Sequence, residues 1–206
     1  MSFTMLVLLL NAASPGPDGW VLDPNSRLFL QGTSTLHDYQ AVAEQMALSV
    51  DAPQEGGHDL AYWLAHAHAL TPTLRIDVAH LKSESEGLDE NMRAALKARE
   101  HPEIVFSVDS CEATRNPAAP DDGVVHIKGR LTVAGASRPV EIVATTHVDA
   151  AHIRLQGSYA LSMLDYGVVP PTFMFGAVRA DDRIVIRFDL FIKPRISHAE
   201  LSKKGL

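Results

Sequence analysis

Residues 129–147 read Gly-Arg-Leu-Thr-Val-Ala-Gly-Ala-Ser-Arg-Pro-Val-Glu-Ile-Val-Ala-Thr-Thr-His, and this stretch decides the fold. Apolar and polar side chains alternate on both sides of a short glycine-containing link, as they do in strands with one apolar and one polar face. Residues 134–137 have turn chemistry, and Pro139 fixes φ where the second arm begins. The stretch therefore predicts a β-hairpin.

The same alternation recurs along most of the chain, at residues 20–32, 39–50, 74–78, 104–108, 153–163 and 184–192. Glu44 falls on the apolar face of its segment, so we expect a bulge or a shift of phase there. About eight alternating strands predict an all-β antiparallel closed sheet, because closure removes exposed edges and a barrel of this size can hold one small ligand. A β-sandwich is the alternative, since alternation alone does not separate the two.

One short α-helix is predicted at about residues 89–99. Asp89 is expected to cap its N-terminus, and the residues that share its apolar face are Leu88, Met92, Ala95 and Leu96. His101-Pro102 is expected to stop the helix. Residues 116–123 are predicted to form a loop. Within the segment 53–70, residues 53–57 are predicted to form a loop and residues 60–67 a short helix or an ordered flap.

The composition is that of one globular domain of 206 residues with a formal net charge of -7. Apart from Lys203-Lys204 there is no cluster of basic residues, which argues against nucleic acid or an anionic membrane as the main partner. Cys111 is the only cysteine, so neither an intramolecular disulfide nor a cysteine metal cluster can form. We expect it to be a small, buried, inert residue.

The apolar run Phe3–Leu10 bears on localisation. It is too short for a stable membrane span, which needs about 20 residues, and its length is that of a signal-peptide core. No Lys or Arg precedes it, so a truncated signal segment and a disordered tail are both open for residues 1–17. We predict export, which would make the protein periplasmic or secreted; without a signal it would be cytoplasmic.

Catalytic and metal-binding patterns are weak in this sequence. His66 and His68 are close in sequence, but no third ligand stands at a recognisable spacing, so we predict a surface pair and no metal site. Nucleophile-elbow, phosphate-loop and dinucleotide fingerprints are missing from the sequence. We therefore predict a protein that is not an enzyme and has no cofactor.

Four stretches in the same order resemble the YceI-like family of lipid- or polyisoprenoid-binding proteins. They are residues 20–24 with Ser26 and Gly32, residues 81–83 with 88–92 and 101–106, residues 129–140, and residues 165–168 with 183–186. The resemblance implies an extended lipocalin-like barrel over residues 18–195, followed by a C-terminal tail at 196–206. It also implies a helix beside the barrel and a long apolar cavity. Residues 53–70 are longer than the family pattern.

With the resemblance, the apolar strand faces become candidates for the lining of a cavity. The candidates are Phe106, Val108, Ile127, Leu131, Ile142, Leu155, Tyr159, Leu161, Ile186 and Phe188. Gly129 and Gly157 on the same faces are expected to leave room for a ligand. Phe173, Met174 and Phe175 are expected to cap one mouth, where His37, Lys82 or Arg179 would hold a polar head group.

The first of the following three functions is the leading prediction, and the other two are its alternatives. The first is a protein that carries or sequesters a polyisoprenoid, a quinone or a related lipid. The second is an enzyme acting on a lipophilic substrate, with His37 and Asp38 as acid and base. The third is a ligand-free scaffold in an envelope assembly or stress response. The sequence is compatible with a homodimer and does not name the ligand.

Overall fold

The computed structural model describes residues 20–51, 71–149, 151–173 and 177–194. The predicted signal segment, the flap at 53–70 with His66 and His68, and the C-terminal tail lie outside these residues. The strands are β1 Trp20–Leu22, β2 Arg27–Ser34, β3 Tyr39–Ala43, β4 Met46–Asp51, β5 Thr71–Asp77, β6 Leu81–Ser83, β7 Glu103–Asn116, β8 Ala119–Val133, β9 Ala136–Val148, β10 Ile153–Ser162, β11 Thr172–Phe173 and β12 Val178–Pro194. The helices are η2 Val78–His80, α2 Glu86–Ala95 and η3 Leu164–Tyr166.

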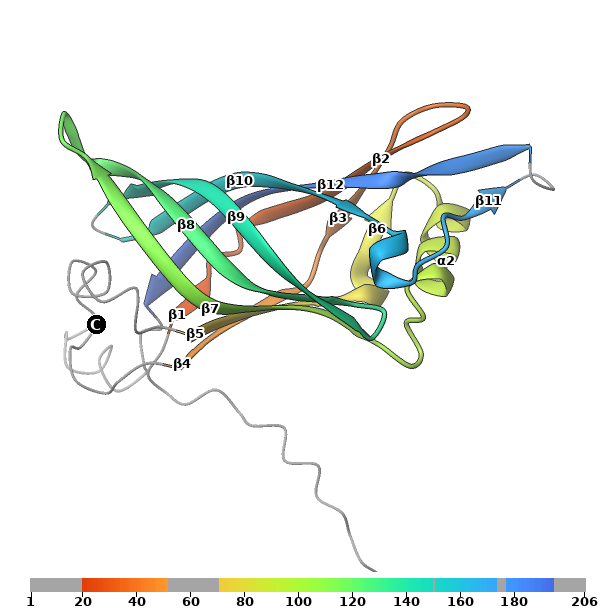
Figure 1. Cartoon of the computed structure of the whole chain (residues 1–206), viewed down its shortest axis with the longest axis horizontal. Helices are drawn as coiled ribbons and strands as arrows, with labels where there is room; N and C mark the ends of the chain where they lie inside the picture. Colours follow the sequence, from red (N-terminus) through yellow and green to blue (C-terminus); the bar gives the residue numbers. More distant parts are fainter. Residues whose placement is uncertain (1–19, 52–70, 150, 174–176, 195–206) are drawn as a thin grey trace, which may run out of the picture.

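The strands form one curled antiparallel sheet in the order β4-β5-β7-β8-β9-β10-β12-β2-β3-β6, with β1 and β11 paired to β12 (Figure 1). This confirms the prediction of an all-β barrel with one short α-helix. The number of strands differs, since the sheet contains twelve. The predicted number of eight is recovered when bent strands are counted once. β3 and β4 are then one strand, β5 and β6 are another, and the short β1 and β11 are left out of the count.

Two bends bring the ends of this strand order together. The segment 39–51 breaks at Glu44 and Gln45, where the sequence predicts a shift of phase. The neighbouring segment 71–83 breaks at the same level, at η2. Hydrogen bonds join the two breaks, from Glu44 N to the His80 carbonyl at 3.0 Å and from Asp77 N to the Gln45 carbonyl at 3.2 Å. The two bent segments therefore connect the strands at the two edges of the sheet, β4 and β6, and close the barrel.

The hairpin of β8 and β9 is confirmed, with twelve residue pairs from Asp122↔His147 to Val133↔Ala136. Its turn contains only Ala134 and Gly135, whose φ angles are 48° and 83°. Two positive φ values identify the turn type that matches the twist of the flanking strands. The link is therefore shorter than the four residues expected from the sequence.

The helix prediction is wrong at both ends. Helix α2 begins at Glu86 after Ser85 and ends at Ala95, and Lys97 just beyond it has a φ of 54°. Asp89 is not the N-cap. Its side chain is 3% exposed and turns back toward β6, where Oδ1 accepts hydrogen bonds from the N–H and the hydroxyl of Ser83, both at 2.7 Å. Asp89 thus fixes the helix to the preceding strand.

The predicted loop at 116–123 is also wrong, because β7 and β8 continue into it. Asn116 pairs with Ala119, and only Pro117 and Ala118 form the turn. The most completely buried side chains are Val78 of η2 and Leu81 of β6, in a core cluster that also includes Ile76 and Ile104. None of the described helices is long and apolar enough to cross a membrane.

Candidate functional site

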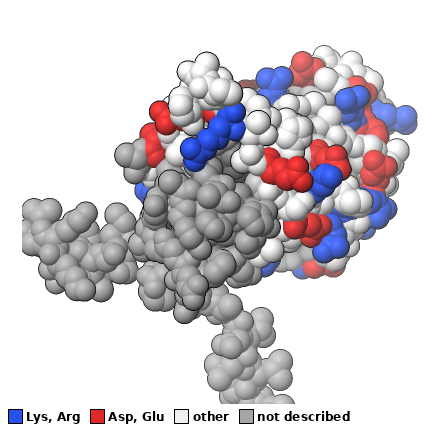
Figure 2. Space-filling view, turned by 60° about the vertical axis from the view of Figure 1, so that its left-hand side comes forward, with Lys and Arg blue, Asp and Glu red and all other residues white. Residues whose placement is uncertain are grey.

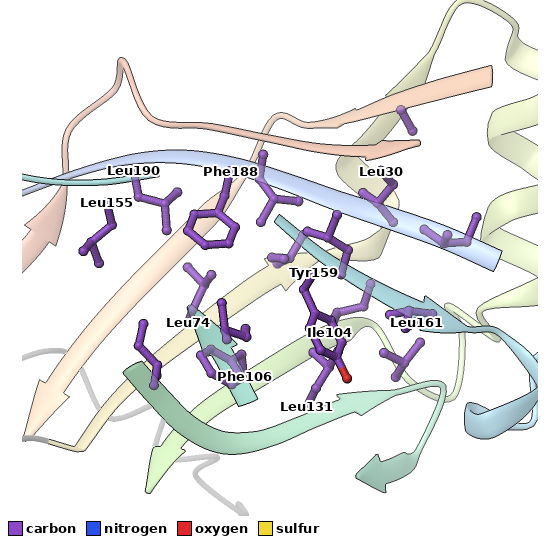
Figure 3. Close-up of a pocket in the computed structure, with 18 of the residues that line it drawn as sticks. Leu30, Leu74, Ile104, Phe106, Leu131, Leu155, Tyr159, Leu161, Phe188 and Leu190 are labelled. Atoms are coloured by element: carbon purple, nitrogen blue, oxygen red, sulfur yellow. The ribbon is translucent and has the colours of Figure 1, made fainter. Parts of the chain in front are cut away.

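The barrel interior contains a cavity with a volume of about 300 Å³, whose lining includes residues of the core cluster such as Ile76, Ile104 and Leu131. Side chains of β1 to β5, β7 to β10 and β12 line it along the barrel, and α2 contributes Leu88, Met92, Ala95 and Leu96 at one end. In Figure 3, Leu74 and Phe106 face Leu155, Phe188 and Leu190 across this space. The volume lies near the lower limit for small-molecule sites, which are roughly 300–1,000 Å³.

The structure brings ten of the predicted lining residues together in this cavity. They are Phe106, Val108, Ile127, Leu131, Ile142, Leu155, Tyr159, Leu161, Ile186 and Phe188. Of the predicted cap, Met174 and Phe175 lie outside the described residues, and Phe173 is described only as part of β11. Whether any of these residues contacts a ligand remains a prediction.

The prediction for the two glycines needs correction, because aromatic rings already occupy the space beside them. A Cβ atom at Gly157 would lie 2.6 Å from Cζ of Phe188, its cross-strand partner. A Cβ atom at Gly129 would meet the carbonyl oxygen of Ser107 first, and would lie 2.9 Å from Cε2 of Phe106. The glycines therefore give their space to neighbouring protein atoms, and the rings of Phe106 and Phe188 lie beside them in the cavity wall.

Several lining residues were missed by the sequence analysis. They include Leu30 on β2, Tyr39 on β3, Leu74 on β5, Ile104 on β7 and the four residues of α2. The strand residues follow the same alternation of apolar and polar side chains as the predicted ones, so the sequence could have identified them as lining residues. The four helix residues were predicted to share an apolar face, but no signal in the sequence indicated that this face lines one end of the cavity.

A few polar groups interrupt the apolar lining. Burial raises the pKa of Tyr39 and of Tyr159, and the nearby carboxylates of Asp181 and Asp165 add to the respective shifts. Burial, with a smaller effect of Glu112, also raises the pKa of Cys111, so its thiol stays protonated and weakly nucleophilic. The Cys111 side chain is half-buried and faces the cavity, so the expectation of a fully packed residue is wrong.

The three predicted head-group residues do not line the cavity. His37 is exposed, and its Nδ1 lies 2.7 Å from the carbonyl of Asp38. Lys82 pairs with Asp89 at 3.3 Å, and Arg179 is exposed on β12. The geometry gives no support to their assignment as head-group ligands.

Within the described ranges, no group of three His, Cys, Asp or Glu side chains is arranged to hold a metal ion. Charged side chains of both signs are interspersed over the face shown in Figure 2, without an extended patch of one sign. The chemistry that the site offers is therefore the burial of an apolar molecule, which needs shape and apolar surface and no charged group.

The fold and this cavity define a lipocalin-like barrel with an apolar interior site. The YceI-like domain matches residues 26–192, and the chain belongs to this family. No curated protein matches the chain in sequence.

Solved structures show the same fold. Burkholderia cenocepacia BcnA gives a TM-score of 0.62 at 15% identity, over 83% of this chain and 98% of that one. A polyisoprenoid-binding domain from Saccharophagus degradans gives 0.62 at 14% identity, over 85% and 98%. A Campylobacter jejuni YceI protein gives 0.52 at 18% identity, over 72% and 80%. Identities this low establish a likeness of fold.

Proposed function

We propose that the protein binds the apolar chain of a polyisoprenoid, a quinone or a related lipid in the barrel cavity, and so carries or sequesters it. The observation that supports this most strongly is the cavity itself, since apolar side chains from ten strands and α2 surround unfilled space. A dry core of this composition would close on itself, because native interiors are packed as densely as organic crystals.

The energy available from such a site is sufficient for tight binding. Removing about 400 Å² of ligand hydrocarbon from water would contribute up to about 10 kcal/mol at ~25 cal/mol/Å². Lost translational and conformational freedom reduces this figure by several kcal/mol, so dissociation constants in the micromolar range or below are expected. The membership of the family and the name of the Saccharophagus degradans domain agree with an apolar ligand.

The two alternative functions find less support. The enzyme hypothesis requires His37 and Asp38 to converge on the cavity, and both are exposed outside its lining. A ligand-free scaffold would need no internal space, whereas about 300 Å³ remains open. The apolar run Phe3–Leu10 supports a periplasmic or secreted location for the proposed carrier.

Native mass spectrometry of the full chain, purified from a host that makes isoprenoid lipids, tests the proposal. We expect a mass increment that disappears after organic extraction, and the extract should contain a hydrophobic compound. The extracted protein should then bind geranylgeraniol with a stoichiometry of one. Failure to copurify any lipid, together with failure to bind geranylgeraniol after extraction, would refute the function.

A further inference from the structure

The sheet is open between β9 and β10 over half of their length. Their pairing begins at Val148↔Ile153 and ends at Ala144↔Gly157. Residues 136–143 of β9 and 158–162 of β10 therefore face a gap instead of each other, and Figure 1 shows the two strands diverging toward the η3 end. Pro139 lies on this side of β9, where a residue without an N–H is tolerated because no ladder bond is needed.

The gap forms a polar surface cleft, which we call the β9–β10 cleft. Its charged side chains are Arg138 from β9, Asp165 from η3, and Asp182 and Arg183 from β12. Asp182 is already engaged, since it accepts a hydrogen bond from the N–H of Leu164 at 2.8 Å.

The two arginines leave donors free. Arg138 donates once, from Nη1 to the carbonyl of Ser137 at 3.1 Å, and is exposed. Within the described residues, the guanidinium of Arg183 makes no hydrogen bond or ion pair, and neither does the carboxylate of Asp165. A guanidinium has five N–H donors in a planar fork, so both arginines can still bind ligand oxygens.

The cleft and the apolar cavity share one wall. Tyr159, Leu161 and Tyr166 line both of them. Burial raises the pKa of Tyr166 to about 12, and Tyr159 and Asp165 add to the rise while Arg138 opposes it, which places the charged groups of the cleft close to this ring. A molecule that passes these three side chains would have its tail in the cavity and its head in the cleft.

The charges of the cleft indicate which head group it suits. Two arginines and two aspartates line it, so its formal charge is zero. A phosphate or diphosphate would add a net negative charge beside two carboxylates, whereas neutral carbonyl or hydroxyl oxygens accept hydrogen bonds from the arginines without that repulsion.

We propose that the β9–β10 cleft is the head-group site of the bound lipid, and that Arg138 and Arg183 donate hydrogen bonds to an uncharged, oxygen-bearing head group. This rests on the proposed function, because the tail must occupy the cavity. It replaces His37, Lys82 and Arg179 as the residues that select the head group.

Three ligands with the same isoprenoid skeleton test the proposal: geranylgeraniol, geranylgeranyl diphosphate and the parent hydrocarbon without a head group. Each is delivered from cyclodextrin, and its affinity is measured by displacement of ANS from the full chain. The test variant is R138Q with R183Q. The matched control is R75Q with R187Q, which removes two exposed arginines that do not line the cleft.

We expect the native protein to bind the alcohol at least about tenfold more tightly than the hydrocarbon, since a hydrogen bond to a charged donor is worth roughly this factor. The diphosphate should bind no more tightly than the alcohol. The test variant should lose the preference for the alcohol but keep its affinity for the hydrocarbon, and the control variant should retain both.

Equal affinity of the native protein for alcohol and hydrocarbon would overturn the head-group site while leaving the proposed function intact. Tighter binding of the diphosphate would overturn the choice of an uncharged head group. Binding of none of the three ligands would overturn both proposals.

Discussion

Val108 offers a direct test of whether a ligand uses the cavity. It lies on β7 opposite Gly129, is 9% exposed, and lines the cavity. Replacing it by Phe adds about four carbon atoms, close to one isoprene unit. If the added ring takes space from the ligand tail, about 3 kcal/mol of binding free energy is lost at about 0.8 kcal/mol per buried CH2. This corresponds to a loss of affinity of roughly a hundredfold or more.

The affinity of V108F for geranylgeraniol, measured by ANS displacement, checks the magnitude. The matched control is V143F, the same substitution on the outer face of β9, where Val143 is 54% exposed. The control should bind like the native protein. The free energy of unfolding, measured with urea on the lipid-extracted proteins, tests separately whether the space beside Val108 is empty in the ligand-free protein. V108F should change it little, because the ring enters free volume, whereas overpacking a filled core costs about 1–3 kcal/mol.

Two results would refute this reasoning. One is a folded V108F that binds geranylgeraniol with native affinity, since the tail would then not pass Val108. The other is a loss of about 1–3 kcal/mol of stability in the ligand-free protein, since the space beside Val108 would then already be filled.

Two further predictions concern stability. D89A should lower the free energy of unfolding by about 2–3 kcal/mol, because it removes the buried carboxylate that accepts two hydrogen bonds from half-buried Ser83. E90A on the exposed face of α2 should change it by less than about 0.5 kcal/mol. Urea denaturation distinguishes these values, and equal effects of the two variants would contradict the anchoring role of Asp89. The second prediction concerns Asp23, whose pKa is lowered from 3.8 to about 2 by its hydrogen bond to Lys193 and by a backbone N–H. Since the folded pKa lies below the unfolded one, its stabilisation is complete above about pH 4 and is lost as the pH falls toward about 2. Thermal melting across this range should show a smaller decrease for K193M than for the native protein, and identical pH profiles would argue against the pairing.

Much of the fold could be predicted because it follows from local pattern. Alternation of side chains across a strand is a property of the backbone, so residues 129–147 predict a hairpin and its two faces without reference to the rest of the chain. The same rule placed ten residues on the face that lines the cavity. The break at Glu44 was also visible, because one charged residue on an apolar face is a local conflict.

The errors arose where a distant or unseen partner decides the conformation. Asp89 has the residue type of an N-cap, but the donors of Ser83 on β6 bind its carboxylate, so the helix begins three residues earlier. Residues 116–123 have turn chemistry, yet the long pairing of β7 with β8 continues to Asn116 and Ala119 and leaves only Pro117 and Ala118 in the turn.

The sequence by itself determined that this chain makes a barrel with an apolar inner face, because that outcome requires only the period of its side chains. Only the tertiary structure decided what the inner face encloses. Free volume depends on how rings and helices from separate segments meet, as Phe106 and Phe188 do over Gly129 and Gly157. The opening between β9 and β10 depends in the same way on the bending of the whole sheet, so its polar residues become a site only when the barrel has folded.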